Sequence, residues 1–592
     1  MPWACSPSRP PATGAGAAPS DWVRPGDPGW PSEAAWEGLR RAVGGRLLEV
    51  GSPLDACRAD PTGAACAELF RNLKNPYFIG DHPALTQTSG WLDAWSSSPS
   101  ARAVAVEETA DVVAAVNFAR EHTVRLVIKG GGHSYQGTSN APDSLLVWTR
   151  RMNAIELHDA FVPEGCAGRV EPQPAVTVGA GALWGHVYQS VSVDGGRYVQ
   201  GGGCATVGVA GLIQSGGFGS FSKRFGLAAA GLLEAEVVTA DGAVRIVNAC
   251  TEPDLFWALK GGGGGTFGIV TRVTLRTREL PETFGAAFGK IRANSDDAYR
   301  ALLARFLAHY RDRLMNPHWG EQARFEGDNT LRLSMLFQGL NQTEAEAAWI
   351  PFVEWVSGLP EDYQWVEPLS ILAVPARSFW DPAFLEEYAS QFVLFDDRPG
   401  SPKANVYWAG NRGEAGQFLH AYRSAWLPAS LLGNKAMQAN VLDERMGRLT
   451  EAVFTASRHW TMSLHFNKGL AGSPPEEIAA ARDTAMNPAV LDAFALAIVA
   501  GEGPPAFSGI PGHEPDPVEG PRAADRIHAA MAELLEVAPG AGSYVSESDY
   551  FENDWQRSYW GANHPRLAEV KRAYDPDGLF AVHNGVGSGS SR

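Results

Sequence analysis

One histidine and one cysteine each stand at the end of a glycine run, where the backbone can be approached most closely. His133 ends the glycine run of "GGGHSYQG" (130–137), and Cys204 ends a second run in "GGGCATVG" (201–208). Imidazole and thiol groups are nucleophiles, and glycines without a Cβ let the main chain approach a ligand closely. Taken alone, such a histidine is more often a structural residue, and such a cysteine an inert core residue. The glycine context indicates a role beyond packing.

Four glycine-rich stretches occupy the same part of the chain, at 130–137, 179–185, 200–219 and 260–268. Backbone N–H groups in such turns can surround phosphate oxygens. The stretch "GAGALWG" is similar to a dinucleotide fingerprint, but its spacing is GxGxxxG and no acidic residue follows in a clean βαβ unit. Several loops spread along the chain favour one long ligand, such as FAD, whose pyrophosphate and ring contact different loops.

The elements that position these loops follow from the hydrophobic pattern. Ser32 is a candidate N-cap for a helix with Trp36, Leu39 and Val43 on one face. From residue 101, helix and strand alternate: "VAVEETADVVAAVNFAREHTVRLVIKGGG" predicts a strand, a helix, and a buried strand that ends at Ile128. The segment "AVTVGAGALWGHVYQSV" predicts a strand, a glycine turn and a helix.

Further along, "LLEAEVVTADGAVRIVNA" predicts a hairpin that turns at Asp241-Gly242. The segment "DLFWALKGGGGGTFGIVTRVTLRT" runs from a helical turn through five glycines into a strand. Beyond Leu280 the glycine clusters stop, and amphipathic helices with scattered aromatic residues are expected. Residues 536–592 are expected to return to strand and turn structure.

The amino-acid composition limits the classes of partner that the protein is expected to bind. A formal charge of −17 argues against nucleic acid and anionic membrane surfaces, and no apolar run is long enough to span a bilayer. Six cysteines are too few for a disulfide scaffold and form no CxxC metal motif, but Cys57 and Cys66 could close a disulfide. That pair, and Cys5 in a flexible Pro/Ala-rich leader (1–20), favour an exported protein over a cytoplasmic one, although the leader lacks the apolar core of a signal peptide.

The combination of motifs is specific. In order, "GGGHSYQG", "GGCATVGVAGLIQSGGFG", "DLFWALKGGGGGTFGIVT" and "YWGANHPRLAEVKRAYDPDGLF" resemble the berberine-bridge-enzyme-like branch of the vanillyl-alcohol-oxidase flavoproteins, over residues 75–592. The resemblance implies an α+β fold: a PCMH-type FAD-binding domain of two α/β subdomains, and a substrate domain with an antiparallel sheet backed by helices. We assign residues 21–100 to an N-terminal extension, 101–280 to the FAD domain, 281–535 to the substrate domain, and 536–592 to a segment that returns to the FAD domain.

The resemblance also implies site residues. His133 would be bonded to the flavin 8α-methyl group and Cys204 to flavin C6, so that FAD is held at two edges of its ring. The other expected cofactor contacts come from the same motifs and the C-terminal segment: Gly130, Gly131, Gly132, Ser134, Gly137, Thr206, Val207, Gly208, Gly211, Gly216, Gly217, Gly268, Ile269, Val270 and Asn584. No metal ligand is expected. Leu212 stands where many relatives carry a histidine near the ribityl chain, so hydrogen bonding there must differ.

Three residues are candidates for catalytic roles. In relatives a Tyr-x-Asn-Tyr segment supplies a base; here Tyr544 matches its first tyrosine and Glu547 replaces its second. A buried glutamate can serve as general base when its pKa rises towards neutrality; the plain alternative is a solvated acid on a strand edge. Tyr135, two residues after His133, matches a ring near flavin and substrate in relatives, or is simply packed.

The expected function is that of an FAD-dependent oxidase. It would transfer hydride from a C–H bond of a small alcohol, sugar or secondary metabolite to the flavin, with oxygen reduced to hydrogen peroxide. Val207 supports oxygen as acceptor, because valine at this position accompanies oxidases in the family; it could also be a plain core residue. A flavin dehydrogenase with another acceptor and a catalytically silent flavin-fold binding protein remain alternatives. The sequence decides neither the substrate nor the oligomeric state.

Overall fold

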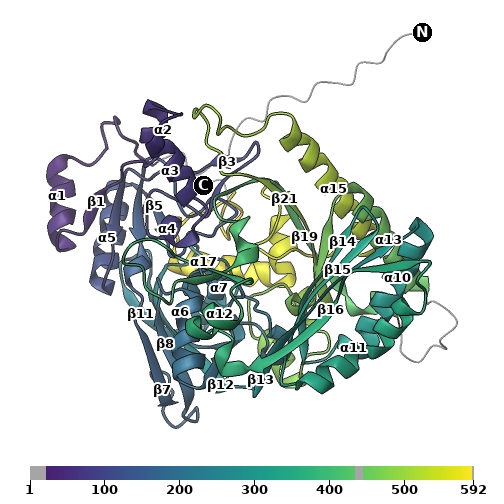
Figure 1. Ribbon diagram of the computed structural model, residues 1–592. Coiled ribbons are helices and arrows are strands. Elements are labelled where there is room, and N and C mark those ends of the chain that lie inside the picture. The colour runs from purple at the N-terminus through teal and green to yellow at the C-terminus, as the bar shows by residue number, and fades with distance from the viewer. Residues whose placement is uncertain (1–21, 434–443, 590–592) are drawn as a thin grey trace.

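Three β-sheets with covering helices form the chain (Figure 1), in a computed structural model that describes residues 22–433 and 444–589. The leader at 1–20, with Cys5, lies outside the described residues. The sheets have four, six and nine strands, and a separate two-stranded pair joins β17 (Val393–Phe395) to β18 (Val406–Trp408). Helices are combined with mostly antiparallel sheets, which confirms the predicted α+β class.

The four-stranded sheet carries the loop that holds His133. Its order is β1 (Leu47–Glu49), β4 (Arg102–Ala105), β6 (Ser144–Trp148), β5 (Arg125–Lys129), and β4 and β5 both run parallel to β6. Strand β6 is buried throughout, as parallel strands covered on both faces usually are. Helices α1 (Glu33–Ala42) and α5 (Thr109–His122) bury the predicted apolar faces, and Ser32 caps α1 as expected.

The six-stranded sheet is antiparallel. Its main path is β11 (Val244–Asn248), β10 (Leu232–Val238), β12 (Ile269–Glu279), β8 (Gln173–Gly179) and β7 (Ile155–Phe161), and β9 (Arg197–Val199) pairs with the far end of β12. The predicted hairpin is confirmed, because β10 pairs with β11 around Asp241 and Gly242. The predicted helical turn before the five glycines is α9 (Pro253–Leu259).

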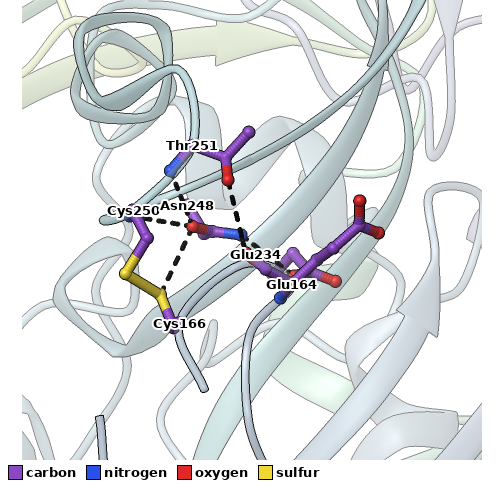
Figure 2. The surroundings of a disulfide bond; sticks show 6 residues. All are labelled: Glu164, Cys166, Glu234, Asn248, Cys250 and Thr251. Atoms are coloured by element: carbon purple, nitrogen blue, oxygen red, sulfur yellow. Dashed lines mark hydrogen bonds between the residues drawn. A yellow bond between two sulfur atoms is a disulfide. The ribbon is translucent and has the colours of Figure 1, made fainter. Parts of the chain in front are cut away.

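A disulfide that the sequence did not suggest fastens this sheet (Figure 2). Cys166, in the loop before β8, is bonded to Cys250, just after β11, across 84 residues. Beside it, the Asn248 side chain donates to the Glu164 carbonyl at 2.9 Å and to Glu234 Oε2 at 3.1 Å. Cys57 and Cys66 are also joined, and within the described residues only Cys204 is a free thiol.

The third sheet has nine strands. Its order is β16 (Tyr363–Pro375), β13 (Thr283–Ala293), β15 (Thr330–Gln338), β14 (Trp319–Glu326), β20 (Met462–His465), β21 (Ala493–Gly503), β19 (Gln417–Pro428), β2 (Thr88–Trp91), β3 (Trp95–Ser96). One face packs against helices, seen at the right of Figure 1: α10 (Asp296–His309), α11 (Gln342–Ser357), α13 (Glu444–His459) and α15 (Glu519–Val537).

Two strands of this sheet come from residues 21–100, which we assign to an N-terminal extension. Strand β2 pairs parallel to β19, with Thr88 opposite Gln417 and Trp91 opposite Leu419, and β3 completes a hairpin with β2. Residues 88–96 therefore form one edge of the nine-stranded sheet.

The strands predicted for the C-terminal segment are absent, although its turns are present. Residues 536–592 contain no strand within their described part; between the turns they form α16 (Trp555–Trp560) and α17 (His564–Tyr574), in the yellow region at the centre of Figure 1. Trp560 Nε1 donates to the Gly261 carbonyl at 3.0 Å, and Lys571 Nζ donates to the Thr266 carbonyl at 2.7 Å. These bonds hold the segment against the five-glycine loop. No helix in the described part of the chain is long and apolar enough to cross a membrane.

Removing the Cys166–Cys250 bond should destabilise the fold measurably. The C166A/C250A variant is expected to lose about 2–4 kcal/mol of unfolding free energy, the usual contribution of a native disulfide. The C57A/C66A variant should lose less, because its bond joins residues 9 apart rather than 84, and closing a longer loop removes more entropy from the unfolded chain. Urea unfolding followed by tryptophan fluorescence measures both; an equal or larger loss in C57A/C66A would contradict the expectation.

Candidate active site

A single cavity of about 1380 Å³ lies between the glycine-rich loops and the nine-stranded sheet. Its walls include residues of the loops at 130–137, 202–211 and 263–268, of the C-terminal segment, and of the sheet's inner face. Pockets for one drug-sized ligand usually measure roughly 300–1,000 Å³. This cavity therefore has room for a large cofactor and a substrate together.

Two glycine loops meet backbone to backbone at the base of the cavity. The loop after β5 reaches the loop before α7 (Val209–Gln214) so closely that a Cβ on Gly131 would lie 2.6 Å from the Gly208 nitrogen. A Cβ on Gly208 would lie 2.8 Å from the Gly131 nitrogen. Neither backbone can shift away freely, so only glycine fits at both positions. This contact fixes His133 and Cys204 relative to each other.

His133 and Cys204 both line the cavity, and Thr206 lies behind them. Thr206 Oγ1 is 3.1 Å from His133 Nε2 and 3.6 Å from Cys204 Sγ. Burial lowers the pKa of His133 to about 4 and raises the pKa of the Cys204 thiol. The imidazole is thus neutral at pH 7, as a nitrogen nucleophile must be.

The cavity suits FAD on two observations. Its glycine walls leave room that any Cβ would fill, and two amide oxygens on it have no partner within the described chain: Gln136 Oε1 and Gln214 Oε1. Gln214 is 7% exposed, and buried polar atoms are normally hydrogen-bonded. A ligand with N–H or O–H donors, as the FAD ring and ribityl chain have, would satisfy them. No cluster suited to a metal ion occurs in residues 22–433 and 444–589.

Most of the residues predicted for the site face this cavity. The cavity-lining members of that set are Gly130, Gly131, Gly132, His133, Ser134, Tyr135, Gly137, Cys204, Val207, Gly208, Gly211, Gly268, Val270, Tyr544, Glu547 and Asn584. Leu212, at the position of the family's histidine, also lines it.

Four predicted cofactor contacts do not line the cavity. Thr206 is 2% exposed and supports His133 and Cys204 from behind. A Cβ on Gly216 would meet the Met486 sulfur, and one on Gly217 would meet Leu212 and Ala228, so these glycines serve packing. Ile269 is fully buried in the core under the four-stranded sheet.

The two C-terminal candidates are engaged with protein groups. Lys468 Nζ donates to both carboxylate oxygens of Glu547 at 2.6 Å, so Glu547 is not the solvated acid of the alternative interpretation. The Tyr544 ring packs edge-on against Phe218 with centroids 5.1 Å apart. Burial raises the pKa of Tyr544, which keeps its hydroxyl protonated.

Tyr135 is paired with a tyrosine that sequence reasoning missed. The rings of Tyr135 and Tyr422, on β19, have centroids 5.0 Å apart, and both line the cavity. Burial raises the pKa of each phenol well above its ordinary value. Both hydroxyls are therefore hydrogen-bond donors at neutral pH.

Glu414 is the acid best suited to proton transfer, and it was also missed. It lies in the loop "GNRGEAG" before β19, is exposed onto the cavity, and accepts a hydrogen bond from Asn411 Nδ2 at 3.2 Å. Burial by the surrounding protein, with the nearby charge of Glu502, raises the pKa of Glu414 to about 7. An acidic residue inside a glycine-rich loop was the only sequence signal.

The aromatic residues between 349 and 408 divide between core and cavity. Trp349 is fully buried against the helices, whereas Trp380 and Trp408 line the cavity. Trp408 Nε1 donates to the Gly203 carbonyl at 2.9 Å, which ties the β18 segment to the Cys204 loop.

Comparison with known proteins agrees with this geometry. The profile described as "FAD binding domain" matches residues 100–248, and the profile "Berberine and berberine like" matches residues 543–587. The FAD-linked oxidoreductase malF of Malbranchea aurantiaca is 30% identical over 593 residues, covering 94% of this chain and 90% of the relative.

The chain belongs to the berberine-bridge-like FAD-linked oxidoreductases. Among solved structures, this oxidoreductase is similar to the VAO-type flavoprotein MtVAO615 of Myceliophthora thermophila, with a TM-score of 0.76, 25% identity, and coverage of 96% of this chain and 97% of that one. Glucooligosaccharide oxidase of Acremonium strictum, which carries a 6-S-cysteinyl, 8α-N1-histidyl FAD, shares the fold at 21% identity and a TM-score of 0.62, over 82% of this chain and 91% of that one.

A side chain at the loop contact should prevent cofactor binding. Gly131→Ala is expected to push the two loops apart, because the new Cβ meets backbone atoms that no rotamer change can move. Flavin content, measured as visible absorbance relative to protein, should fall severalfold. Gly38→Ala, on the surface of α1 with no atom near the new Cβ, is the control; a G131A protein with full flavin content would contradict the expectation.

Proposed function

We propose that this oxidoreductase is an oxidase whose FAD is attached through both His133 and Cys204. The observation that carries the proposal is that these two nucleophiles open into one cavity on either side of Thr206. In this proposal residues 101–280 and 536–592 hold the cofactor, and residues 281–535 hold a small organic substrate.

Different side chains of the site have different roles in the proposed reaction. FAD, when bound, accepts a hydride and passes its electrons to oxygen. Thr206 orients the neutral His133 ring through its contact with Nε2. Cys204 supplies a second attachment from the opposite loop. Two attachments on loops that cannot separate hold the ring in one orientation towards the substrate wall.

Glu414 is our candidate for the general base. With a pKa of about 7 it is largely ionised just above neutral pH and can accept a proton from a substrate hydroxyl or amine. Tyr135 and Tyr422 are placed to donate hydrogen bonds to the same substrate group. Glu547 is less suitable, because both of its oxygens are occupied by Lys468.

Oxygen is the acceptor we favour, supported by Val207 on the cavity wall. Hydrogen peroxide formed in air, in proportion to oxidised substrate, separates an oxidase from a dehydrogenase with another acceptor. A protein without turnover on a broad panel of alcohols, sugars and amines would instead fit a silent binding protein. Export remains our proposal for localisation, supported by two disulfides within the described residues.

Covalent attachment has a direct test. Acid-precipitated wild-type protein should stay yellow, because covalent flavin is not released on unfolding. His133→Ala and Cys204→Ala should each keep one linkage and stay coloured, whereas H133A/C204A should release all its flavin. Mass spectrometry of the tryptic peptides that contain positions 133 and 204 locates each adduct. Release of all flavin from the wild-type protein would overturn the proposal.

The proposed general base, Glu414, predicts how kcat/KM depends on pH. Because Glu414 must be ionised to accept a proton, kcat/KM should fall about tenfold per pH unit below pH 7 and level off above it. Glu414→Gln should reduce kcat/KM by about 10²–10⁴-fold and remove this acid limb. Glu547→Gln is the matched comparison and should keep the limb. An unchanged limb in E414Q would exclude Glu414 as the base.

A further inference from the structure

Residues of the N-terminal extension hold the loop that carries Glu414. Lys74, just before α4 (Pro76–Gly80), donates from Nζ to the Gly413 carbonyl at 3.3 Å and to the Ala415 carbonyl at 3.1 Å. These two residues stand immediately before and after Glu414 in the sequence. One amino group therefore bridges the backbone on both sides of the proposed base.

The same loop packs directly on the N-terminal backbone and its apolar core. A Cβ on Gly416, whose φ is +70°, would lie 2.5 Å from the Leu73 carbonyl oxygen, so the two segments touch backbone to backbone. Ala415 is buried in the apolar cluster that contains Leu73 and the disulfide-bonded pair Cys57 and Cys66. The helices joined by this disulfide therefore support the loop from below.

One residue of the extension bonds both to this loop and to the His133 loop. The Gln87 backbone N–H donates to the Gly132 carbonyl at 2.9 Å, and the Gln87 carbonyl accepts from the Gly416 N–H at 2.8 Å. Its side-chain Nε2 donates to the carbonyl of the first residue of α4 at 2.6 Å. The extension therefore fixes the position of the Glu414 loop relative to the loop that carries His133.

The contact of Lys74 with backbone oxygens leaves the carboxylate of Glu414 free to react. Lys74 forms no ion pair within residues 22–433 and 444–589, and the Glu414 side chain accepts a hydrogen bond from Asn411 Nδ2. An ammonium bonded to the carboxylate itself would favour its ionised form and lower its pKa. Lys74 thus restrains the position of Glu414 without neutralising it.

Several charged and titratable groups face Glu414 from other elements. They are Tyr135, Cys204, Arg324, Tyr422, Lys468 and Glu502. Burial contributes most to the raised pKa of Glu414, ahead of the charge of Glu502, whereas Arg324 and Lys468 lower it. Burial also lowers the pKa of Lys74, with Arg412 acting in the same direction and Glu502 against it. Because burial dominates at Glu414, opening the loop to water should reverse much of its raised pKa.

We propose that Lys74 is a positioning residue for Glu414 and holds the base in place on the cavity wall. The inference rests on the proposed function, because it takes Glu414 to be the base. Lys74 does not itself line the cavity, so it acts through the loop and not on a ligand. The N-terminal extension thereby takes part in the reaction.

Carbodiimide labelling of the holoenzyme tests the proposal without a substrate. A carbodiimide reacts with protonated carboxyl groups and glycinamide traps the product, so peptide mass spectrometry over a pH series gives the midpoint of each acid separately. In the wild-type protein, labelling of Glu414 should fall with a midpoint close to pH 7. In Lys74→Met, which cannot donate to either carbonyl, the midpoint should move down by about one pH unit or more, towards the pKa of about 4.3 of an exposed glutamate.

Further variants separate positioning from general stability. Lys74→Arg should keep the wild-type midpoint, because a guanidinium group has donors for both carbonyls. Lys74→Gln, whose shorter side chain cannot reach both carbonyls, should move the midpoint as K74M does, and it replaces K74M if that protein loses its flavin. Arg71→Met removes an exposed positive charge from α3 (Ala64–Asn72) and is the control. An unmoved midpoint in both K74M and K74Q, or an equal displacement in R71M, overturns the proposal.

Kinetics distinguishes this failure from a failure of the proposed function. On any alcohol, sugar or amine that releases peroxide, K74M should lower kcat about tenfold or more, because the base is displaced. The acid limb of kcat/KM should move with the labelling midpoint, and the flavin adducts at positions 133 and 204 should be unchanged. Retention of the acid limb by E414Q would remove Glu414 as the base, which is a failure of the proposed function. A K74M midpoint equal to that of the wild type, with the acid limb lost in E414Q, would exclude only Lys74 as the positioning residue.

Discussion

The contact between Gly131 and Gly208 is the constraint on which the site depends. Two chain segments from different sheets approach until no Cβ fits between them, and each then presents a nucleophile to the same cavity. Thr206 completes the arrangement by contacting both side chains. Because the backbones themselves touch, the geometry does not rely on flexible side chains, and a reactive ring can be held without a large reorganisation.

The sequence predicted this half of the molecule well, since the signals are local. Glycine runs at strand ends placed His133 and Cys204, and hydrophobic periodicity gave α1, α5 and the β10–β11 hairpin. Thr206 and Ile269 do not line the cavity, because a motif says which segment approaches a ligand but not which side chain turns away from it. The helices at the C-terminus were missed although His564-Pro565 starts one, and Leu567 and Val570 share its buried face.

The side of the cavity formed by the nine-stranded sheet was much less predictable, because its residues are brought together by strand register. Tyr422, His465 and Gln322 face the cavity only because their strands are paired in a particular alignment, across large separations in the sequence. The Cys166–Cys250 disulfide was also hard to predict, because its two cysteines are 84 residues apart in the sequence. The chemistry of Glu414 depends on burial and on the neighbouring Glu502, neither of which composition reveals.

The β2–β3 hairpin joins the two halves in a way that affects how the protein can form. Strand β2 of the hairpin extends the nine-stranded sheet by pairing with β19. The hairpin also contacts the His133 loop, where Trp95 Nε1 donates to the Tyr135 carbonyl at 3.2 Å. A Cβ on Gly137 would lie 2.6 Å from the Trp95 ring. Strand β2 can therefore pair with β19 only after a segment more than three hundred residues later in the sequence has been translated. The Trp95 contacts that support the His133 loop therefore come from a hairpin whose own place in the sheet depends on β19.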